Sequence, residues 1–246
     1  MAGAVEPAAW RRRLVADASR PYLKAGPGLF AYLFARGKLA GDPVYRAILE
    51  HGLLAGKSRI LDLGCGQALL AAWLRAAQRL HAGGLWPEGW PAAPNPASIS
   101  GIELMPRDVE RACRAVGADA DILQGDVRHA DFGTADAVVM LDVVHYLRPD
   151  EQLSVLQRVR ASMPVDGVLL LRICDPGGGV RSRYTQWVDR TAMILRGHVR
   201  VVPHFRSVPE WRSVLRDVGF KSDVWPMSHG TPFTNVLIIA RAVDHP

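Results

Sequence analysis

The spacing of apolar positions in residues 59–74 changes once. The run RILDLGCGQALLAAWL begins with β-forming residues that end at Asp62, passes two glycines, and continues with apolar residues at i, i+1, i+4 and i+5. That second spacing is typical of a buried helix, so the run predicts a strand, a tight turn and a helix. At Gly64 and Gly66 a ligand could approach bare backbone.

The same alternation of apolar strands and amphipathic helices continues along the chain. It predicts βαβ units and a mostly parallel sheet, hence an α/β fold. Strands are expected at 59–63, 98–104, 121–124, 136–141, 167–174, 221–225 and 233–241, and helices at 69–80, 106–116 and 149–163.

A further helix is predicted before the last two strands. Ser207 is its expected N-cap, Glu210 follows three residues later as in a capping box, and Gly219 is the stop. The short loop 226–232 predicts a hairpin, so the last strand should run antiparallel to its neighbour.

Three segments depart from the alternation. Residues 81–97 are rich in Pro, Gly and Trp and predict an irregular insertion, and residues 177–206 predict a glycine-rich hinge with a helix at 181–195. Before the first strand, two helices separated at Gly41-Asp42-Pro43 are expected to form a lid. We therefore expect one domain over 1–246, with a helical lid (1–55), a core (56–175), an inserted segment (176–206) and a closing helix and hairpin (207–246).

Composition narrows the class of protein. The chain has 246 residues, is 49% hydrophobic, and contains no apolar run long enough for a membrane span. Its start lacks the order of a signal peptide, and Cys65, Cys113 and Cys174 form no CxxC pair, so we expect a cytoplasmic protein with reduced thiols. The net charge of +6 comes from scattered basic residues, mostly arginine, which disfavours nucleic acid but suits an acidic partner.

Two acidic residues stand where strands of a parallel sheet end, the edge at which such sheets bind ligands. Glu103 could accept both vicinal hydroxyls of a ribose, and Asp126 could accept from the exocyclic amine of a purine. The alternative is that both carboxylates only cap strand ends.

Several motifs in order resemble those of class I S-adenosylmethionine-dependent methyltransferases: LDLGCGQA, GIEL, LQGDV, ADAVVMLDVVHYL, GVLLLRICD and, at the end, FTNVLIIARA. The resemblance covers residues 56–175 well and 207–242 less closely. It implies a doubly wound, Rossmann-like, seven-stranded sheet with an antiparallel last strand. It also implies S-adenosyl-L-methionine as cofactor, S-adenosyl-L-homocysteine as product, and cofactor contacts by Asp62, Gly64, Cys65, Gly66, Glu103, Leu104, Asp126, Val127 and Leu141.

Two features depart from the family pattern. Ala68 stands where a third glycine is usual, and Glu103 lies 37 residues after Gly66 because the Pro/Trp insertion intervenes. A dehydrogenase is the nearest alternative enzyme, but its fingerprint needs a small residue where this chain has Leu69. The histidines show no metal-ligand spacing, so no metal is expected.

Methyl transfer to oxygen needs a group that removes a proton, and His145, His204 and His229 are the candidate bases. We rank His145 first because it directly follows the fourth strand, whereas the other two lie in loops, and each could instead be a structural histidine. The sequence after the fourth strand, Leu141-Asp142-Val143-Val144, lacks the Asn/Asp-Pro-Pro-aromatic motif of enzymes that methylate nucleic-acid amines. Aromatic residues suit an apolar small acceptor or merely pack the lid: Tyr22, Phe30, Tyr32, Phe34, Tyr184 and Trp187.

The arrangement also resembles methyltransferases of polyketide and aryl-polyene pathways, which makes an acyl carrier protein a candidate partner. We therefore expect methyl transfer to an oxygen of an aromatic or carboxylated small molecule. The alternatives are an RNA or protein methyltransferase and a cofactor-binding subunit without catalysis.

Overall fold

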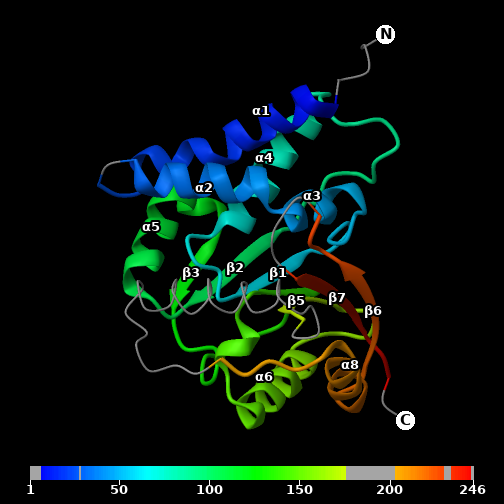
Figure 1. Cartoon of the computed structure of the whole chain (residues 1–246). Coiled ribbons are helices and arrows are strands. Elements are labelled where there is room, and N and C mark those ends of the chain that lie inside the picture. The colour runs from blue at the N-terminus through cyan, green and yellow to red at the C-terminus, as the bar shows by residue number, and fades with distance from the viewer. Residues whose placement is uncertain (1–6, 28, 176–202, 230–233, 245–246) are drawn as a thin grey trace. The chain divides into compact units, whose positions relative to one another are not determined.

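A computed structural model describes residues 7–27, 29–175, 203–229 and 234–244 of the chain (Figure 1). The chain divides into two compact units, Met1–Val127 and Arg128–Pro246. Each unit holds part of the sheet, whose strands are ordered β3-β2-β1 in the first unit and β4-β5-β7-β6 in the second.

The first unit contains three parallel strands joined by helices. Its strands are β1 (Arg59–Leu63), β2 (Ser98–Glu103) and β3 (Asp121–Gln124), and β2 pairs with both of the others. Helix α4 (Leu69–Ala82) connects β1 to β2, and α5 (Pro106–Val116) with the short η2 (Gly117–Asp119) connects β2 to β3. The glycine run after β1 is held against β2, since the Gly64 and Cys65 amides both donate to the Ile102 carbonyl.

Four N-terminal helices complete this unit: α1 (Pro7–Ser19), η1 (Arg20–Lys24), α2 (Phe30–Gly41) and α3 (Pro43–Glu50). Helix α1 lies beside α2 and packs on α4, α3 also packs on α4, and η1 packs on α5 (Figure 1). These helices therefore cover the helical layer of the unit. The predicted break between α2 and α3 is confirmed, and the Asp42 side chain caps α3 by accepting from the Val44 amide at 3.1 Å.

The second unit contains β4 (Ala137–Leu141), β5 (Val168–Cys174), β6 (Phe220–Pro226) and β7 (Asn235–Ala242). Strands β4 and β5 are parallel, and β7 runs antiparallel to both β5 and β6. The helices in the described part of this unit are η3 (Val144–Tyr146), α6 (Pro149–Ala161) and α8 (Val208–Asp217). All seven residues of β5 are buried, as expected for an inner strand.

The predicted α/β fold with a mostly parallel seven-stranded sheet and an antiparallel last strand is confirmed. The capping box at Ser207 and Glu210 is also present, and Gly219 follows α8 with a φ of 94°. Helix α1 was not predicted, and the irregular insertion begins at Gly83 because α4 continues to Ala82. The helix expected at 181–195, with Tyr184 and Trp187, lies outside the described residues.

Cys65, Cys113 and Cys174 form no disulfide in the structure. Within the described ranges, no helix is both long enough and apolar enough to cross a bilayer.

Candidate functional site

The loop between β1 and α4 contains three residues in the left-handed backbone region. Gly64 has a φ of 70°, Gly66 of 55° and Ala68 of 59°. Glycine adopts this conformation freely, whereas an alanine in it costs roughly 1 kcal/mol. The left-handed backbone at position 68 explains why related proteins usually have glycine there. Ala68 adopts the same conformation at that energetic cost. A side chain built at Gly66 would meet open space, so the surface beside this residue is accessible.

Glu103, at the end of β2, ties this loop to the sheet. Its Oε2 accepts from the Gly66 amide and its Oε1 accepts from the Met105 amide, both at 2.9 Å. Each carboxylate oxygen still has a second lone pair for a ligand hydroxyl. Glu103 therefore shapes the glycine loop in the absence of ligand, a role that sequence reasoning did not predict.

Asp62 and Cys65 lie next to this carboxylate. Burial, and then the charge of Glu103, raises the pKa of Asp62 from 3.8 to about 7. Burial, Asp62 and Glu103 together raise the pKa of the Cys65 thiol, which keeps it protonated. The Cys65 side chain fills the space that a side chain at Gly101 would need, since a Cβ there would lie 2.7 Å from Cys65 Sγ. The structure thus brings together four of the predicted cofactor residues: Asp62, Cys65, Gly66 and Glu103.

A contact from the N-terminal helices also fixes the loop. The hydroxyl of Tyr22, a fully buried residue of η1, donates to the Gln67 carbonyl at 2.7 Å. The Gln67 side chain is buried as well, and no donor in the described part of the chain reaches its Oε1. Nothing in the sequence pointed to this contact, because its acceptor is a backbone atom 45 residues away.

Replacing Tyr22 with phenylalanine is expected to lower the free energy of unfolding by about 1–2 kcal/mol, because the buried Gln67 carbonyl loses its donor. Urea denaturation measures this change. Tyr32→Phe is the matched control, since the Tyr32 hydroxyl makes only an exposed contact with Arg36 and its loss should change stability by less than about 0.5 kcal/mol. Equal losses in the two variants would contradict a special role for the Tyr22 bond.

The residues of this loop fit a cofactor that carries positive charge. Two neighbouring carboxyl groups, one with a raised pKa, and a buried amide oxygen without a donor present acceptors beside an open backbone surface. A cation placed there would favour the ionised form of Asp62 and offset the cost of burying it. S-adenosylmethionine, with a sulfonium and an ammonium group, has this character.

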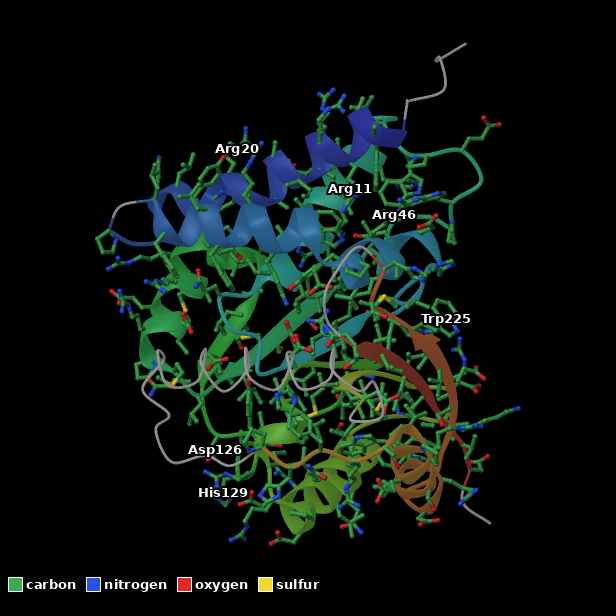
Figure 2. The ribbon with its side chains drawn as sticks, viewed as in Figure 1. Arg11, Arg20, Arg46, Asp126, His129 and Trp225 are labelled. Atoms are coloured by element: carbon green, nitrogen blue, oxygen red, sulfur yellow. The ribbon has the colours of Figure 1, made fainter. Side chains whose placement is uncertain are left out.

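The remaining predicted cofactor residues of the first unit follow β2 and β3. Leu104 is exposed, Val127 is buried, and Asp126 is half-buried in the loop after β3 (Figure 2). The Gly125 amide donates to the Glu103 carbonyl at 2.9 Å, which places the start of this loop beside the end of β2.

In the second unit, the end of β4 carries a charged pair that sequence reasoning missed. Asp142 follows Leu141 with a φ of 60°, and its carboxylate receives two hydrogen bonds from Arg172 of β5, through Nε at 2.7 Å and through Nη2. The Arg172 side chain is fully buried, whereas that of Asp142 is 33% exposed. This bidentate geometry fixes the carboxylate and leaves part of it accessible. An arginine within the otherwise apolar strand VLLLRIC was the available signal.

His145 is buried on this side of the second unit. Its ring stacks on Phe205 with centroids 5.4 Å apart and meets Tyr146 edge-on. Burial lowers the pKa of His145 from 6.5 to about 4, against an opposing effect of Asp142 and with a further lowering by Arg172. The imidazole is therefore neutral at pH 7 and a weak base.

His204 lies beside His145, and its amide donates to the His145 carbonyl at 2.7 Å. The fully buried Gln152 connects this region, because its Nε2 donates to the carbonyls of Val144, Leu147 and His204 while its Oε1 accepts from Arg206. His204 itself is half-buried, and His229 is exposed after β6. The structure thus brings His145 and His204 together, and among the described residues His229 makes no hydrogen bond to either.

Comparisons with known proteins identify the family. A model described as a methyltransferase domain matches residues 20–223. The carboxy-S-adenosyl-L-methionine synthase of Chromohalobacter salexigens is 31% identical over 129 residues, which are 50% of this chain and 42% of that protein, so the match spans less than half of that relative.

Two solved structures share the fold. An O-methyltransferase family protein from Burkholderia thailandensis has a TM-score of 0.58 at 17% identity, covering 98% of this chain and 72% of that one. Human N-acetylserotonin methyltransferase, solved with S-adenosylmethionine, has a TM-score of 0.57 at 18% identity, covering 97% of this chain and 68% of that one. The chain therefore belongs to the methyltransferase domain family, and its cofactor is S-adenosyl-L-methionine.

Proposed function

We propose that this methyltransferase acts on a hydroxyl oxygen of a small aromatic or carboxylated molecule, free or tethered to an acyl carrier protein. When bound, the cofactor supplies an electrophilic methyl group on its sulfonium. We assign cofactor binding to the residues expected from the sequence: Asp62, Gly64, Cys65, Gly66, Glu103, Leu104, Asp126, Val127 and Leu141.

The Asp142–Arg172 pair is the observation that supports an oxygen acceptor. A hydroxyl must present a lone pair to the methyl group while its proton is held elsewhere. The Asp142 carboxylate is fixed by Arg172 and is partly exposed, so an acceptor hydroxyl can reach it from solvent and donate a hydrogen bond to it. We propose that Asp142 orients the acceptor hydroxyl.

The three candidate histidines differ in how deeply they are buried. With its lowered pKa and buried ring, His145 suits a structural role in holding Phe205 and the His204 backbone. His204, half-buried next to it, is the better candidate base, and the exposed His229 is the second. We therefore rank His204 ahead of His145, reversing the order suggested by strand position alone.

Cofactor binding is expected to release protons, because a cation beside Asp62 lowers the raised pKa of that carboxyl. With a pKa of about 7, about half of the Asp62 side chains are protonated at pH 7, so release approaches half a proton per site. Titration calorimetry in two buffers of different ionisation enthalpy measures it. Asp62→Asn should abolish the release, and a wild-type value near zero would contradict this electrostatic account.

The raised pKa of Asp62 also makes the free energy of unfolding of the unliganded chain depend on pH. Between pH 3.8 and about 7 the folded chain holds the Asp62 proton more tightly than the unfolded chain, so this contribution to stability is lost as pH rises through about 7. Cofactor affinity should correspondingly increase from pH 6 to pH 8 and then level off.

The proposed acceptor class is tested by incubating the protein with S-adenosylmethionine and parallel panels of phenols, carboxylic acids, amines, carrier-bound acids and RNA, with mass spectrometry to detect the added methyl group. Methylation of a hydroxyl oxygen of a phenol or of a hydroxyl-bearing acid, with kcat reduced at least tenfold in Asp142→Asn at unchanged cofactor affinity, supports the proposal. Methylation of amines or RNA alone would overturn it. Cofactor binding without transfer to any panel would favour a non-catalytic subunit.

A further inference from the structure

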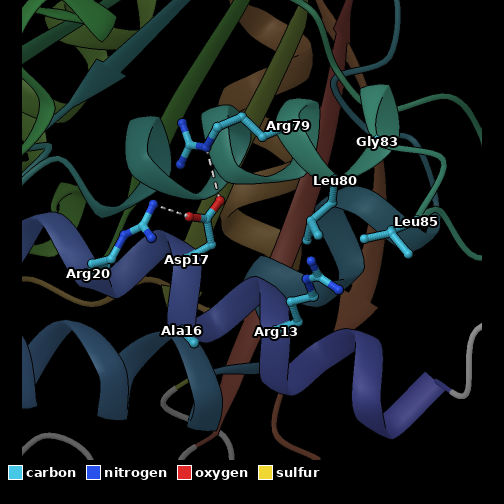
Figure 3. Close-up of a pocket in the computed structure, with 8 residues that line it drawn as sticks. All are labelled: Arg13, Ala16, Asp17, Arg20, Arg79, Leu80, Gly83 and Leu85. Atoms are coloured by element: carbon cyan, nitrogen blue, oxygen red, sulfur yellow. Dashed lines mark hydrogen bonds and ion pairs between the residues drawn. The ribbon is translucent and has the colours of Figure 1, made fainter.

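A pocket of about 520 Å³ lies between α1 and the end of α4, within the first unit. Figure 3 shows side chains from α1 and from α4 meeting around it. Its volume is in the range of small-molecule sites. The lining residues are Arg13, Ala16, Asp17, Arg20, Arg79, Leu80, Gly83 and Leu85.

Asp17 organises two of the three arginines. Its Oδ1 accepts from Arg20 Nη2 at 3.1 Å and its Oδ2 accepts from Arg79 Nε at 3.0 Å (Figure 3). Each guanidinium has five N–H donors, so most donors of both arginines remain for another acceptor. Asp17 therefore holds the two guanidinium groups side by side and uses only part of their hydrogen-bonding capacity.

Arg13 adds a third positive charge on the other side of Asp17. It is exposed, and in the described part of the chain no carboxylate lies within ion-pairing distance of it. Three guanidinium groups and one carboxylate give the lining a net charge of +2. Arg79 also lies in the last turn of α4, where a cation offsets the negative end of the helix dipole.

The remaining walls of the pocket are apolar. Ala16 of α1, Leu80 of α4 and Leu85 after it supply the apolar side chains of the lining, and Leu80 is buried. Gly83, at the end of α4, contributes backbone only. In Figure 3 the side chains of Leu80 and Leu85 lie on the same side of the pocket as the Arg13 guanidinium. A ligand that fits this lining has an anionic head and an apolar body.

The pocket is separate from the glycine loop. That loop precedes the first residue of α4, Leu69, whereas Arg79 lies ten residues further along the helix. At 1.5 Å per residue the two positions are about 15 Å apart. A ligand here would not replace the cofactor.

We propose that this pocket is a binding site for a phosphate monoester with a short apolar group, distinct from the cofactor loop and independent of the acceptor. A phosphate monoester carries a charge of about −1.5 to −2 at pH 7, which matches the net charge of the lining, and its three oxygens suit guanidinium forks.

The test is calorimetric titration of the full chain with hexyl phosphate, with inorganic phosphate and hexanol as partial probes. Hexyl phosphate should bind more tightly than either partial probe, since it meets both the arginines and the leucines. Arg13→Ala should weaken binding of hexyl phosphate about tenfold. Because Arg13 makes no ion pair in the described part of the chain, this change should leave the fold and the affinity for S-adenosylhomocysteine unchanged.

Arg12→Ala is the matched control, because Arg12 is an exposed arginine of the same helix that does not line the pocket. Equal weakening by both substitutions would mean general attraction of an anion to a basic helix and would overturn the proposal. Equal affinity for hexyl phosphate and inorganic phosphate would mean that the apolar residues do not contribute to binding, which would overturn the proposal. Absence of hexyl phosphate binding at millimolar concentration would overturn it as well.

Discussion

Replacing Glu103 with alanine is expected to weaken binding of S-adenosylmethionine a hundredfold or more. The carboxylate is the acceptor for the Gly66 and Met105 amides, and its loss removes the bond between Gly66 and the end of β2 as well as the proposed ribose ligand. Charge-assisted hydrogen bonds of this kind contribute about 1.5–3 kcal/mol each, and a hundredfold change corresponds to about 2.7 kcal/mol. Titration calorimetry of the purified variant measures the change.

Two further variants make this result interpretable. Glu103→Gln keeps one acceptor oxygen and should lose about tenfold in affinity, between wild type and alanine. Glu110→Ala removes an exposed glutamate that pairs only with Arg114 and should bind the cofactor like wild type. Wild-type affinity in a folded Glu103→Ala protein would mean that this carboxylate does not form the cofactor site.

Replacing Asp142 with asparagine is expected to lower the free energy of unfolding by about 3 kcal/mol. The change removes the carboxylate that pairs with the fully buried guanidinium of Arg172, and breaking buried ion pairs typically costs about 3–5 kcal/mol. The lower end of this energy range applies because the Asp142 side chain is one-third exposed. Asparagine tolerates the left-handed backbone at this position, so the variant tests the charge alone. Chemical denaturation gives the value.

A second substitution separates the buried charge from general damage. Adding Arg172→Met to Asp142→Asn removes the orphaned charge and should recover most of the lost stability. Asp150→Asn breaks the exposed Arg148–Asp150 pair and should change stability by less than about 0.5 kcal/mol. A double variant less stable than either single one would contradict this explanation.

The elements of the fold could be predicted from the sequence because their apolar patterns are local. The strand at 59–63 and the helix at 106–116 are present with the predicted bounds, and the hairpin follows from a loop too short for a crossover. Helix α1 was missed because three consecutive arginines break its apolar pattern, although Trp10, Leu14 and Ala18 form its buried face.

The arrangement of side chains within the candidate site could be predicted only in part. The glycines and Glu103 belong to an ordered set of motifs, whereas the bond from Tyr22 to the Gln67 backbone has no sequence signal. The pair of Asp142 and Arg172 joins residues 30 positions apart on two strands, so only the placement of those strands brings them together. The weak basicity of His145 likewise depends on burial by Phe205 and Tyr146, which its position after a strand does not indicate.

Calorimetric titration of the wild-type chain with S-adenosylmethionine and S-adenosylhomocysteine tests whether the glycine loop and Glu103 bind the cofactor. We expect saturable binding of both ligands at one site per chain, with stronger proton release for the sulfonium-bearing cofactor because its extra positive charge acts on Asp62. Absence of binding in a chain whose fold is intact by circular dichroism would mean that the glycine loop and Glu103 do not form a cofactor site.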